Sequence, residues 1–193
     1  EINRRVIDHI ADFNLVYTEH ARRHLLSEGL QHRRIYLTGS PMYEVLQQNM
    51  EKINNSKALE NLNKQLADHT SPITRNHYFM VSFHREENVD NPENLKKILT
   101  ILNNLAEHYQ LPIIVSTHPR SRKRIEAHSD QSPVTNHQIH FLKPFGFTDY
   151  VHLQKNALCT ISDSGTISEE STMLGFPSIS LRQSMERPEA QDA

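Results

Sequence analysis

The sequence predicts an α/β fold in which helices cover both faces of a parallel β-sheet. From residue 77 onward, short apolar segments alternate with segments of helical periodicity. The apolar segments are hydrophobic at nearly every position, rather than at every second one. Strands of that kind are buried on both faces, as in parallel sheets with crossover helices on either side. A chain of 193 residues is long enough for one large domain or for parts of two.

The first part of the chain predicts alternating helical and extended segments. In order, these are a helix over 2–11, an extended segment over 13–17, a helix over 19–27 and a strand within 33–41. The first helix is amphipathic, because its apolar residues recur every three or four positions. Thr18 is a suitable N-cap for the second helix, and Gly29 is a suitable end for it.

The rest of the chain predicts a regular strand–helix alternation after a polar helical stretch over 43–68 and a loop over 70–76. The expected strands are 77–83, 111–117, 139–142, 157–162 and 177–181, and the expected helices are 92–109, about 120–127, 147–155 and 166–174. The helix over 92–109 places five apolar residues on one face: Leu95, Ile98, Leu99, Leu102 and Leu105. We expect a boundary near residues 40–45, so that 1–41 ends one α/β domain and 42–193 forms most of a second.

Composition narrows the class of protein. A formal net charge of −2 does not favour nucleic acid or a membrane surface as the main partner, although thirteen histidines could reverse its sign in mild acid. The single cysteine, Cys159, cannot form an internal disulfide and favours a cytoplasmic protein. No apolar stretch approaches the length of a membrane span. The chain begins at Glu1 within a predicted helix, so we expect a piece of a longer protein.

Four polar loops follow predicted strands, and this coincidence predicts a ligand site. The loops are 84–88, 118–120, 163–166 and 182–189. Ligands of open parallel sheets bind at the carboxyl ends of the strands, where such loops gather. His84 and His118 could serve there or be structural histidines, and Arg85, Arg120 and Arg187 could bind phosphate or be solvated charges.

The stretch "SDSGTISEES" (162–171) is the most informative of these loops. The backbone N–H groups of Ser164, Gly165 and Thr166 would lie at a helix N-terminus, which attracts anions such as phosphate. Glu169 or Glu170 could accept hydrogen bonds from ribose hydroxyls. The alternative is structural, with Ser164 as an N-cap and both glutamates stabilising the helix dipole.

Several motifs are missing from the sequence. It has no G-x-G-x-x-G, no Walker A motif, no H-E-x-x-H and no cysteine pair. These absences disfavour a nicotinamide cofactor, P-loop ATP chemistry and a structural zinc. A metal hydrolase that uses some of the histidines stays as a minor alternative, although they fall in separate loops. The G-x-S-x-G motif of serine hydrolases is also missing.

The motifs together resemble the non-hydrolysing UDP-N-acetylglucosamine 2-epimerase family. "HREEN", "THP", "SDSGTISEES", "LGFP" and "ERPEA" occur in the family order, after "EINRRVIDHIAD" and "YLTGSP". The resemblance covers residues 1–193. Thr166 stands where the common family pattern has a second glycine. In this respect the chain resembles the capsule and O-antigen branch, of UDP-N-acetyl-L-fucosamine synthase type.

The resemblance implies a GT-B fold of two Rossmann-like domains, of which this chain holds the end of the first and most of the second. It implies a substrate of UDP-N-acetylhexosamine type, no metal or nicotinamide cofactor, and a homodimer. It also implies inversion at C2 of the sugar. UDP leaves by anti elimination to give a 2-acetamidoglycal and then re-adds to the opposite face.

The resemblance also assigns roles to residues at matching positions. His84 would assist the departure of UDP, and Tyr150 would lie against uracil, unless that tyrosine is only a packing residue. The remaining residues would bind the nucleotide sugar: His118 and Arg187 at the phosphates, Ser164, Gly165 and the N–H of Thr166 at the diphosphate, Glu170 at the ribose and Arg4 near the sugar. The family's acid/base carboxylates lie upstream of Glu1, so this chain alone is expected to bind UDP without epimerising it.

Two other functions stay open at this point. A GT-B glycosyltransferase would share the fold and the UDP site but would pass the sugar to an acceptor. A non-catalytic UDP-binding module would bind the nucleotide only.

Overall fold

The computed structural model describes residues 2–67, 72–117, 121–122, 124–125 and 136–182. The chain divides into two compact units, one ending at Gln48 and the other beginning at Asn49. The division falls inside helix α3 (Met42–Asn54). A domain boundary near residues 40–45 stays a prediction for the longer protein.

The first unit alternates helices and short strands, as predicted. It contains α1 (Ile2–Ile10), β1 (Asn14–Val16), α2 (Glu19–Ser27), a 3₁₀ turn (His32–Arg34) and β2 (Ile35–Leu37). The two strands pair in parallel, and a small core forms around Val16, Leu25 and Ile35. The predicted cap of α2 is confirmed, because the Thr18 hydroxyl oxygen accepts a hydrogen bond from the N–H of Ala21 at 3.1 Å.

The predicted helical stretch over 43–68 is two helices, α3 and α4 (Ala58–Leu66). Ser56 lies between them. Its hydroxyl oxygen accepts a hydrogen bond from the N–H of Ala58 at 3.1 Å, and the hydroxyl also donates to Asp149 Oδ1 at 2.6 Å. A serine side chain that bonds the nearby backbone competes with helix continuation, which explains the break.

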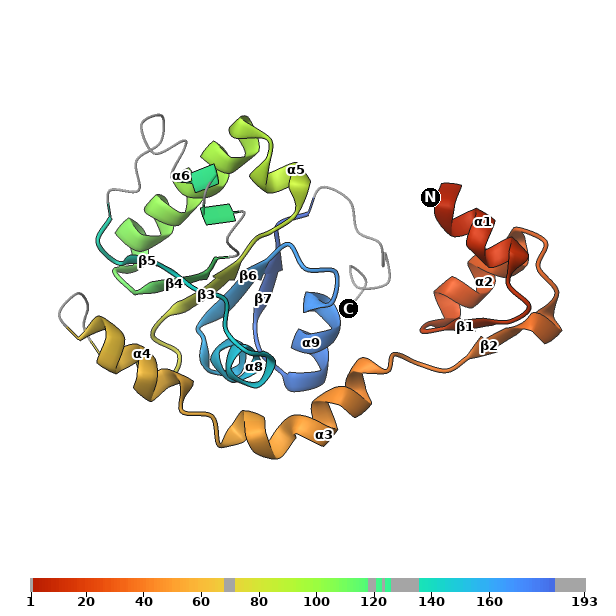
Figure 1. The fold of residues 1–193 in the computed structure, drawn as a ribbon, viewed down its shortest axis with the longest axis horizontal. Coiled ribbons are helices and arrows are strands. Elements are labelled where there is room, and N and C mark those ends of the chain that lie inside the picture. The colour runs from red at the N-terminus through yellow and green to blue at the C-terminus, as the bar shows by residue number, and fades with distance from the viewer. Residues whose placement is uncertain (1, 68–71, 118–120, 123, 126–135, 183–193) are drawn as a thin grey trace. The chain divides into compact units, whose positions relative to one another are not determined.

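Five parallel strands form the sheet of the second unit (Figure 1). They are β3 (Phe79–Ser82), β4 (Ile113–Ser116), β5 (Ile139–Leu142), β6 (Cys159–Ser162) and β7 (Ser178–Ser180). Their order across the sheet is β5-β4-β3-β6-β7. All five predicted strands are therefore present, and the predicted parallel sheet is confirmed.

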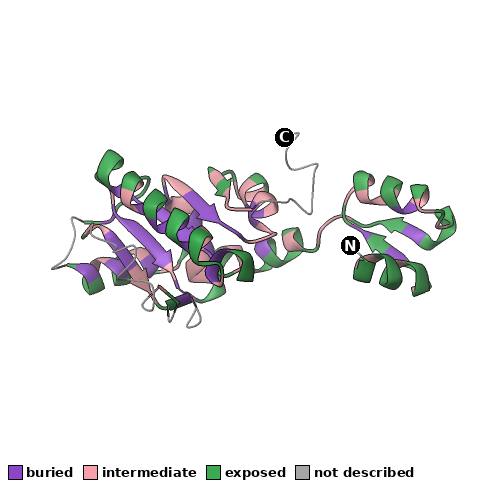
Figure 2. Ribbon diagram, turned by 90° about the horizontal axis from the view of Figure 1, so that it is seen from above, coloured by how far each residue is buried: buried purple, intermediate pink, exposed green. Residues whose placement is uncertain are grey.

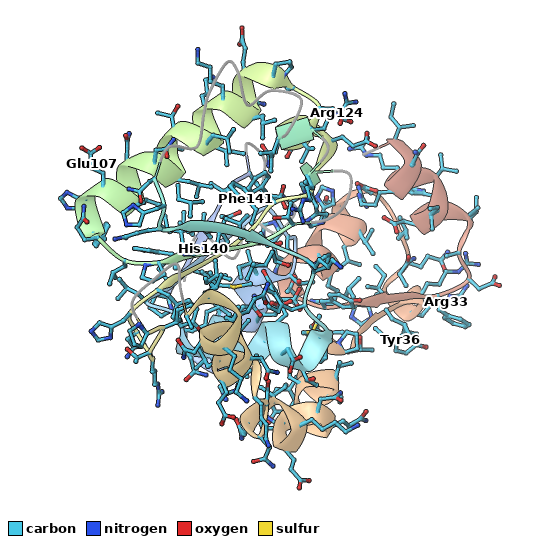
Figure 3. The ribbon with its side chains drawn as sticks, turned by 60° about the vertical axis from the view of Figure 1, so that its left-hand side comes forward. Arg33, Tyr36, Glu107, Arg124, His140 and Phe141 are labelled. Carbon is cyan, nitrogen blue, oxygen red and sulfur yellow. The ribbon has the colours of Figure 1, made fainter. Side chains whose placement is uncertain are left out.

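Both faces of this sheet are buried, because successive side chains of β3 enter different cores. Most residues of β3, β4 and β6 are buried, as the colouring of Figure 2 shows. Phe79 and Val81 pack with helix α6 (Pro92–Tyr109). Tyr78 and Met80 pack with α4 and with α8 (Phe147–Asn156), on the other face of the sheet (Figure 1). The exposed side of α6 carries polar residues such as Glu107, which points away from the sheet (Figure 3). The two-sided core confirms the fold class predicted from uninterrupted apolar strands.

The helices that follow β3, β4 and β6 agree with the prediction to different degrees. Part of the predicted loop over 84–88 forms a one-turn helix, α5 (Glu86–Val89). The helix after β6 is α9 (Ile167–Leu174), as predicted to within one residue. Of the predicted helix over 120–127, residues 121–122 and 124–125 are helical, and the others lie outside the described residues.

None of the described helices is long and apolar enough to cross a membrane.

Candidate active site

The candidate site lies where the strand order of the sheet reverses. From β3 the chain proceeds outward to β4 and β5, and then returns to place β6 on the other side of β3. The loops that follow β3 and β6 therefore leave neighbouring strands in opposite directions, and open parallel sheets bind their ligands at such a switch point. Ser82 and Ser162, the last residues of the two strands, are directly paired. The structure thus brings two of the four predicted loops together.

Of the predicted loops 118–120 and 182–189, only Arg182 belongs to the described part of the chain. His118 and Arg120 lie outside the described residues, and so does Arg187. Their predicted phosphate contacts stay predictions.

Asp163 joins the two loops that are described. Its carboxylate is fully buried and accepts hydrogen bonds from the backbone N–H groups of His84 (3.0 Å to Oδ2) and Arg85 (2.9 Å). The side-chain amide of Asn88 donates to the same carboxylate at 2.9 Å, and Nδ1 of the His84 ring lies 3.1 Å from Oδ1. Neither Asp163 nor Asn88 was predicted as a site residue, although they lie in "SDSGTISEES" and "HREEN".

The Asp163–His84 contact shifts the pKa of both groups. Burial raises the pKa of Asp163, but hydrogen bonds from the His84 ring, from Asn88 and from the backbone of Arg85 and His84 outweigh that effect, so the pKa is lowered. The hydrogen bond to Asp163 raises the pKa of His84 above 6.5, against opposing contributions from partial burial and from the positive charge of Arg85. The His84 side chain is 55% exposed, so a ligand can reach the ring.

The turn between β6 and α9 holds three predicted phosphate ligands. Thr166 is the N-cap of α9, so the structural alternative that made Ser164 the cap was wrong by two residues. The Ser164 hydroxyl oxygen accepts a weak hydrogen bond from the Thr166 N–H at 3.3 Å, and the Ser164 N–H donates to the Ser162 hydroxyl at 3.1 Å. Gly165 lies in the turn between them.

Glu170, on the first turn of α9, faces the same turn. Its buried carboxylate accepts a hydrogen bond from the Thr166 hydroxyl at 2.6 Å and another from the buried amide of Gln154 at 3.0 Å. The second contact ties α8 to α9. Gln154 was not predicted, because only the tertiary fold brings it next to Glu170.

Tyr150 reaches this edge of the sheet from α8. Its side chain packs against the core beside Tyr78 and Met80. Burial raises the pKa of Tyr150 to about 12, opposed by hydrogen bonding with Ser82 and Ser162 and reinforced by the negative charges of Glu170 and Asp163. The phenol therefore stays protonated at physiological pH, and it lies at the strand ends that carry the two loops.

Arg4 belongs to the first compact unit, whereas the residues described above belong to the second. There it contacts Asp8 and Glu28, and its hydrogen bond with Glu28 is the main cause of the lowered pKa of that carboxylate. Its predicted place near the sugar stays a prediction. Among the residues that the structure describes, no three His, Cys, Asp or Glu side chains are grouped so as to hold a metal ion.

Comparison with known proteins agrees with this architecture. A relative in Methanocaldococcus jannaschii, a UDP-N-acetylglucosamine 2-epimerase, is 36% identical over 98% of this chain and 50% of its own length. The solved UDP-N-acetylglucosamine 2-epimerase of Rickettsia bellii is 41% identical with a TM-score of 0.81, covering all of this chain and 48% of that one. The M. jannaschii enzyme in complex with UDP-GlcNAc and UDP gives a TM-score of 0.85 at 33% identity, covering all of this chain and 51% of that one.

These matches confirm the GT-B-type, Rossmann-like fold that the resemblance implied. The chain spans about half the length of the curated relatives it matches. The sequence model of one family, UDP-N-acetylglucosamine 2-epimerase, matches residues 1–193. The chain therefore belongs to the UDP-N-acetylglucosamine 2-epimerase family.

Proposed function

We propose that the protein containing this chain is a C2 epimerase of UDP-N-acetylhexosamines, and that the chain carries mainly its UDP site. The substrate is UDP-GlcNAc or a 6-deoxy relative. The observation that carries the proposal is the meeting of loops 84–88 and 163–166 at the switch point, joined through Asp163. Family members solved with bound UDP-GlcNAc support the same substrate class.

The chemistry we propose is an elimination followed by an addition. A base removes the C2 proton, the C1–O bond breaks, and UDP leaves with the bonding electrons to give a 2-acetamidoglycal. UDP then re-adds at C1 while a proton is returned to C2 on the face opposite to the one it left, which inverts C2. Negative charge develops on the leaving phosphate, so donors directed at it lower the barrier more than they stabilise the bound substrate. The exposed His84 ring is the proposed donor in the described site.

The turn before α9 is the proposed seat of the diphosphate. Ser164, Gly165 and the Thr166 N–H lie at the N-terminal end of an eight-residue helix, where the helix dipole favours an anion. A phosphate oxygen would replace the hydroxyl acceptors that two of these N–H groups now have. His118 and Arg187 are proposed to contact the phosphates, and Arg4 the sugar.

Glu170 and Tyr150 are the proposed contacts to the nucleoside. The Glu170 carboxylate accepts hydrogen bonds from two groups of the protein, Gln154 and Thr166, so its oxygens keep further lone pairs for ribose hydroxyls. Tyr150 is proposed to lie against uracil. The competing role, packing alone, is supported by its contacts with the α4–α8 core.

For the whole protein we further propose a cytoplasmic homodimer that serves capsule or O-antigen polysaccharide synthesis. The single cysteine, which is not in a disulfide, supports the cytoplasmic location. The sequence "DSGTISEES" supports the role in capsule or O-antigen synthesis. Gel filtration with light scattering on the complete protein tests the dimer.

Hydrogen exchange at C2 tests the function. The complete protein is incubated with UDP-GlcNAc, and in parallel with a 6-deoxy UDP-HexNAc, in deuterium oxide without any acceptor. We expect deuterium at C2, detected by NMR, together with a new C2 epimer. A glycosyltransferase would leave the C2 proton in place, and a binding module would bind UDP in calorimetry without exchange. The 193-residue chain alone is expected to bind UDP and show no exchange.

Glu170→Ala is expected to raise KM for the UDP-sugar by about 10- to 100-fold with a much smaller change in kcat, because a hydrogen bond to a charged group contributes about 1.5–3 kcal/mol. The ribose is remote from the reacting carbons, so binding is lost in the ground state and the transition state alike. Steady-state kinetics of the complete protein measure both constants.

The adjacent Glu169→Ala variant is the matched control, because it removes a carboxylate of the same kind from the neighbouring position of α9. The assignment would be wrong if Glu169→Ala raised KM and Glu170→Ala did not.

A further inference from the structure

We propose that Asp163 is the positioning residue for His84: it holds the imidazole through Nδ1, anchors the backbone that carries the ring, and leaves Nε2 for the departing phosphate. The inference rests on the proposed function.

The carboxylate is itself held in a fixed place. Asp163 is the first residue after β6, and its N–H donates to the carbonyl oxygen of Ser82 at 3.2 Å, which continues the β3–β6 pairing by one step. The side chain has no solvent exposure. A buried carboxylate needs hydrogen-bond donors on its oxygens, and here they come from the segment that includes His84.

Two of these donors, the backbone N–H groups of His84 and Arg85, fix the backbone of that segment through three hydrogen bonds. The His84 N–H donates to both carboxylate oxygens, at 3.0 and 3.2 Å, and the Arg85 N–H donates to Oδ2 at 2.9 Å. The Arg85 Nε–H donates to the backbone carbonyl of Asp163 at 2.9 Å. These contacts fix the position of the His84 Cα atom without any contribution from the ring.

Asn88 supports the carboxylate from one turn further along. Its amide nitrogen donates to Asp163 Oδ2 at 2.9 Å and to the carbonyl oxygen of Leu181 at 3.2 Å. Asn88 is buried and lies on α5, while Leu181 follows β7. Asn88 therefore links the Asp163 carboxylate, after β6, to the chain that follows β7.

The remaining contact sets the chemistry of the ring. Nδ1 lies 3.1 Å from Asp163 Oδ1, and an ionised carboxylate can only accept, so Nδ1 carries the hydrogen. Nε2 is then the nitrogen available to a ligand, as a donor when the ring is protonated. Among the described residues, the charge of Arg85 opposes protonation of His84. Glu170 and Asp163 are further charged groups of this edge, and both act on Tyr150.

The pH dependence follows from the direction of the shift. The contact with Asp163 raises the pKa of His84 in the folded protein. The stability contributed by the pair is complete below the ordinary pKa of 6.5 and is lost as the pH rises through the raised value. Without the carboxylate charge, His84 should lose its proton at lower pH.

Asp163→Asn tests the role in the complete protein, because it keeps the shape of the side chain and removes the charge. We expect a lower pKa for His84, read from its imidazole NMR signal, and a high-pH limb of the kcat profile displaced to lower pH. We expect kcat near neutrality to fall about 10- to 100-fold, as when a metal-binding histidine loses the partner that orients its ring. His84→Gln assigns the NMR signal among the thirteen histidines.

Asn88→Ala is the matched control for a general weakening of the hydrogen bonds around Asp163. It removes one donor to the Asp163 carboxylate and leaves the contact of that carboxylate with the His84 ring in place. An unchanged His84 titration in Asp163→Asn, or a loss of kcat without any displacement of the pH profile, overturns the proposal. If Asp163→Asn does not fold, the unsubstituted protein still decides: nitrogen-15 NMR must show neutral His84 with hydrogen on Nδ1, and hydrogen on Nε2 refutes the role. Both NMR results are independent of C2 exchange, so failure of the proposed function is recognised separately.

Discussion

His84→Ala is expected to lower kcat for C2 epimerisation by about 100- to 1,000-fold in the complete protein, with a much smaller change in KM. The ring follows the carboxyl end of β3, at the switch point of the sheet, and is 55% exposed. Its proposed interaction is with charge that appears only as UDP leaves, so its loss should raise the barrier and leave substrate binding largely intact. Initial rates over a range of UDP-GlcNAc concentrations measure the effect.

His77→Ala is the matched control, because this exposed histidine precedes β3 at the opposite end of the same strand. Its kcat should equal that of the unsubstituted protein. Unchanged turnover in His84→Ala would contradict the role proposed for His84.

Leu99→Ala is expected to lower the free energy of unfolding of the second unit by about 2–5 kcal/mol. Leu99 is 1% exposed and packs with Leu95 and Leu102 of α6 against β3 and β4. The substitution removes apolar contacts and leaves a cavity that neighbouring side chains fill only in part. Urea unfolding followed by far-UV circular dichroism measures the change.

Ile101→Ala on the same helix is the comparison, since Ile101 is 44% exposed. Its unfolding free energy should change by less than about 1 kcal/mol. Equal losses in the two variants would contradict the placement of the α6 core face.

The two compact units differ in how well sequence periodicity predicted burial. In α6 the residues expected to share a face do so, and Leu95, Ile98, Leu99 and Leu102 are buried. In α1 the helix was predicted correctly, yet none of its apolar residues is buried in the structure. Periodicity reports which side chains share one side of a helix, and what covers that side depends on residues distant in sequence.

The candidate site shows the same division. His84, Ser164, Thr166 and Glu170 were predicted from motifs next to strand ends, and the structure brings their loops to one edge of the sheet. Asp163, Asn88 and Gln154 were not predicted, because a buried polar residue can be recognised only when its partners are known. Those partners lie 75 residues away for Asn88 with Asp163 and 16 residues away for Gln154 with Glu170.

The sequence by itself determined the parallel sheet, its five strands, the covering helices and the loops that carry the site, because hydrophobic periodicity and capping are local properties of the chain. Only the tertiary structure decided the strand order β5-β4-β3-β6-β7, and with it the neighbours of His84. Strand order depends on contacts between segments far apart in the sequence, which no local pattern encodes. The burial of Asp163 beneath the His84 segment follows from that order.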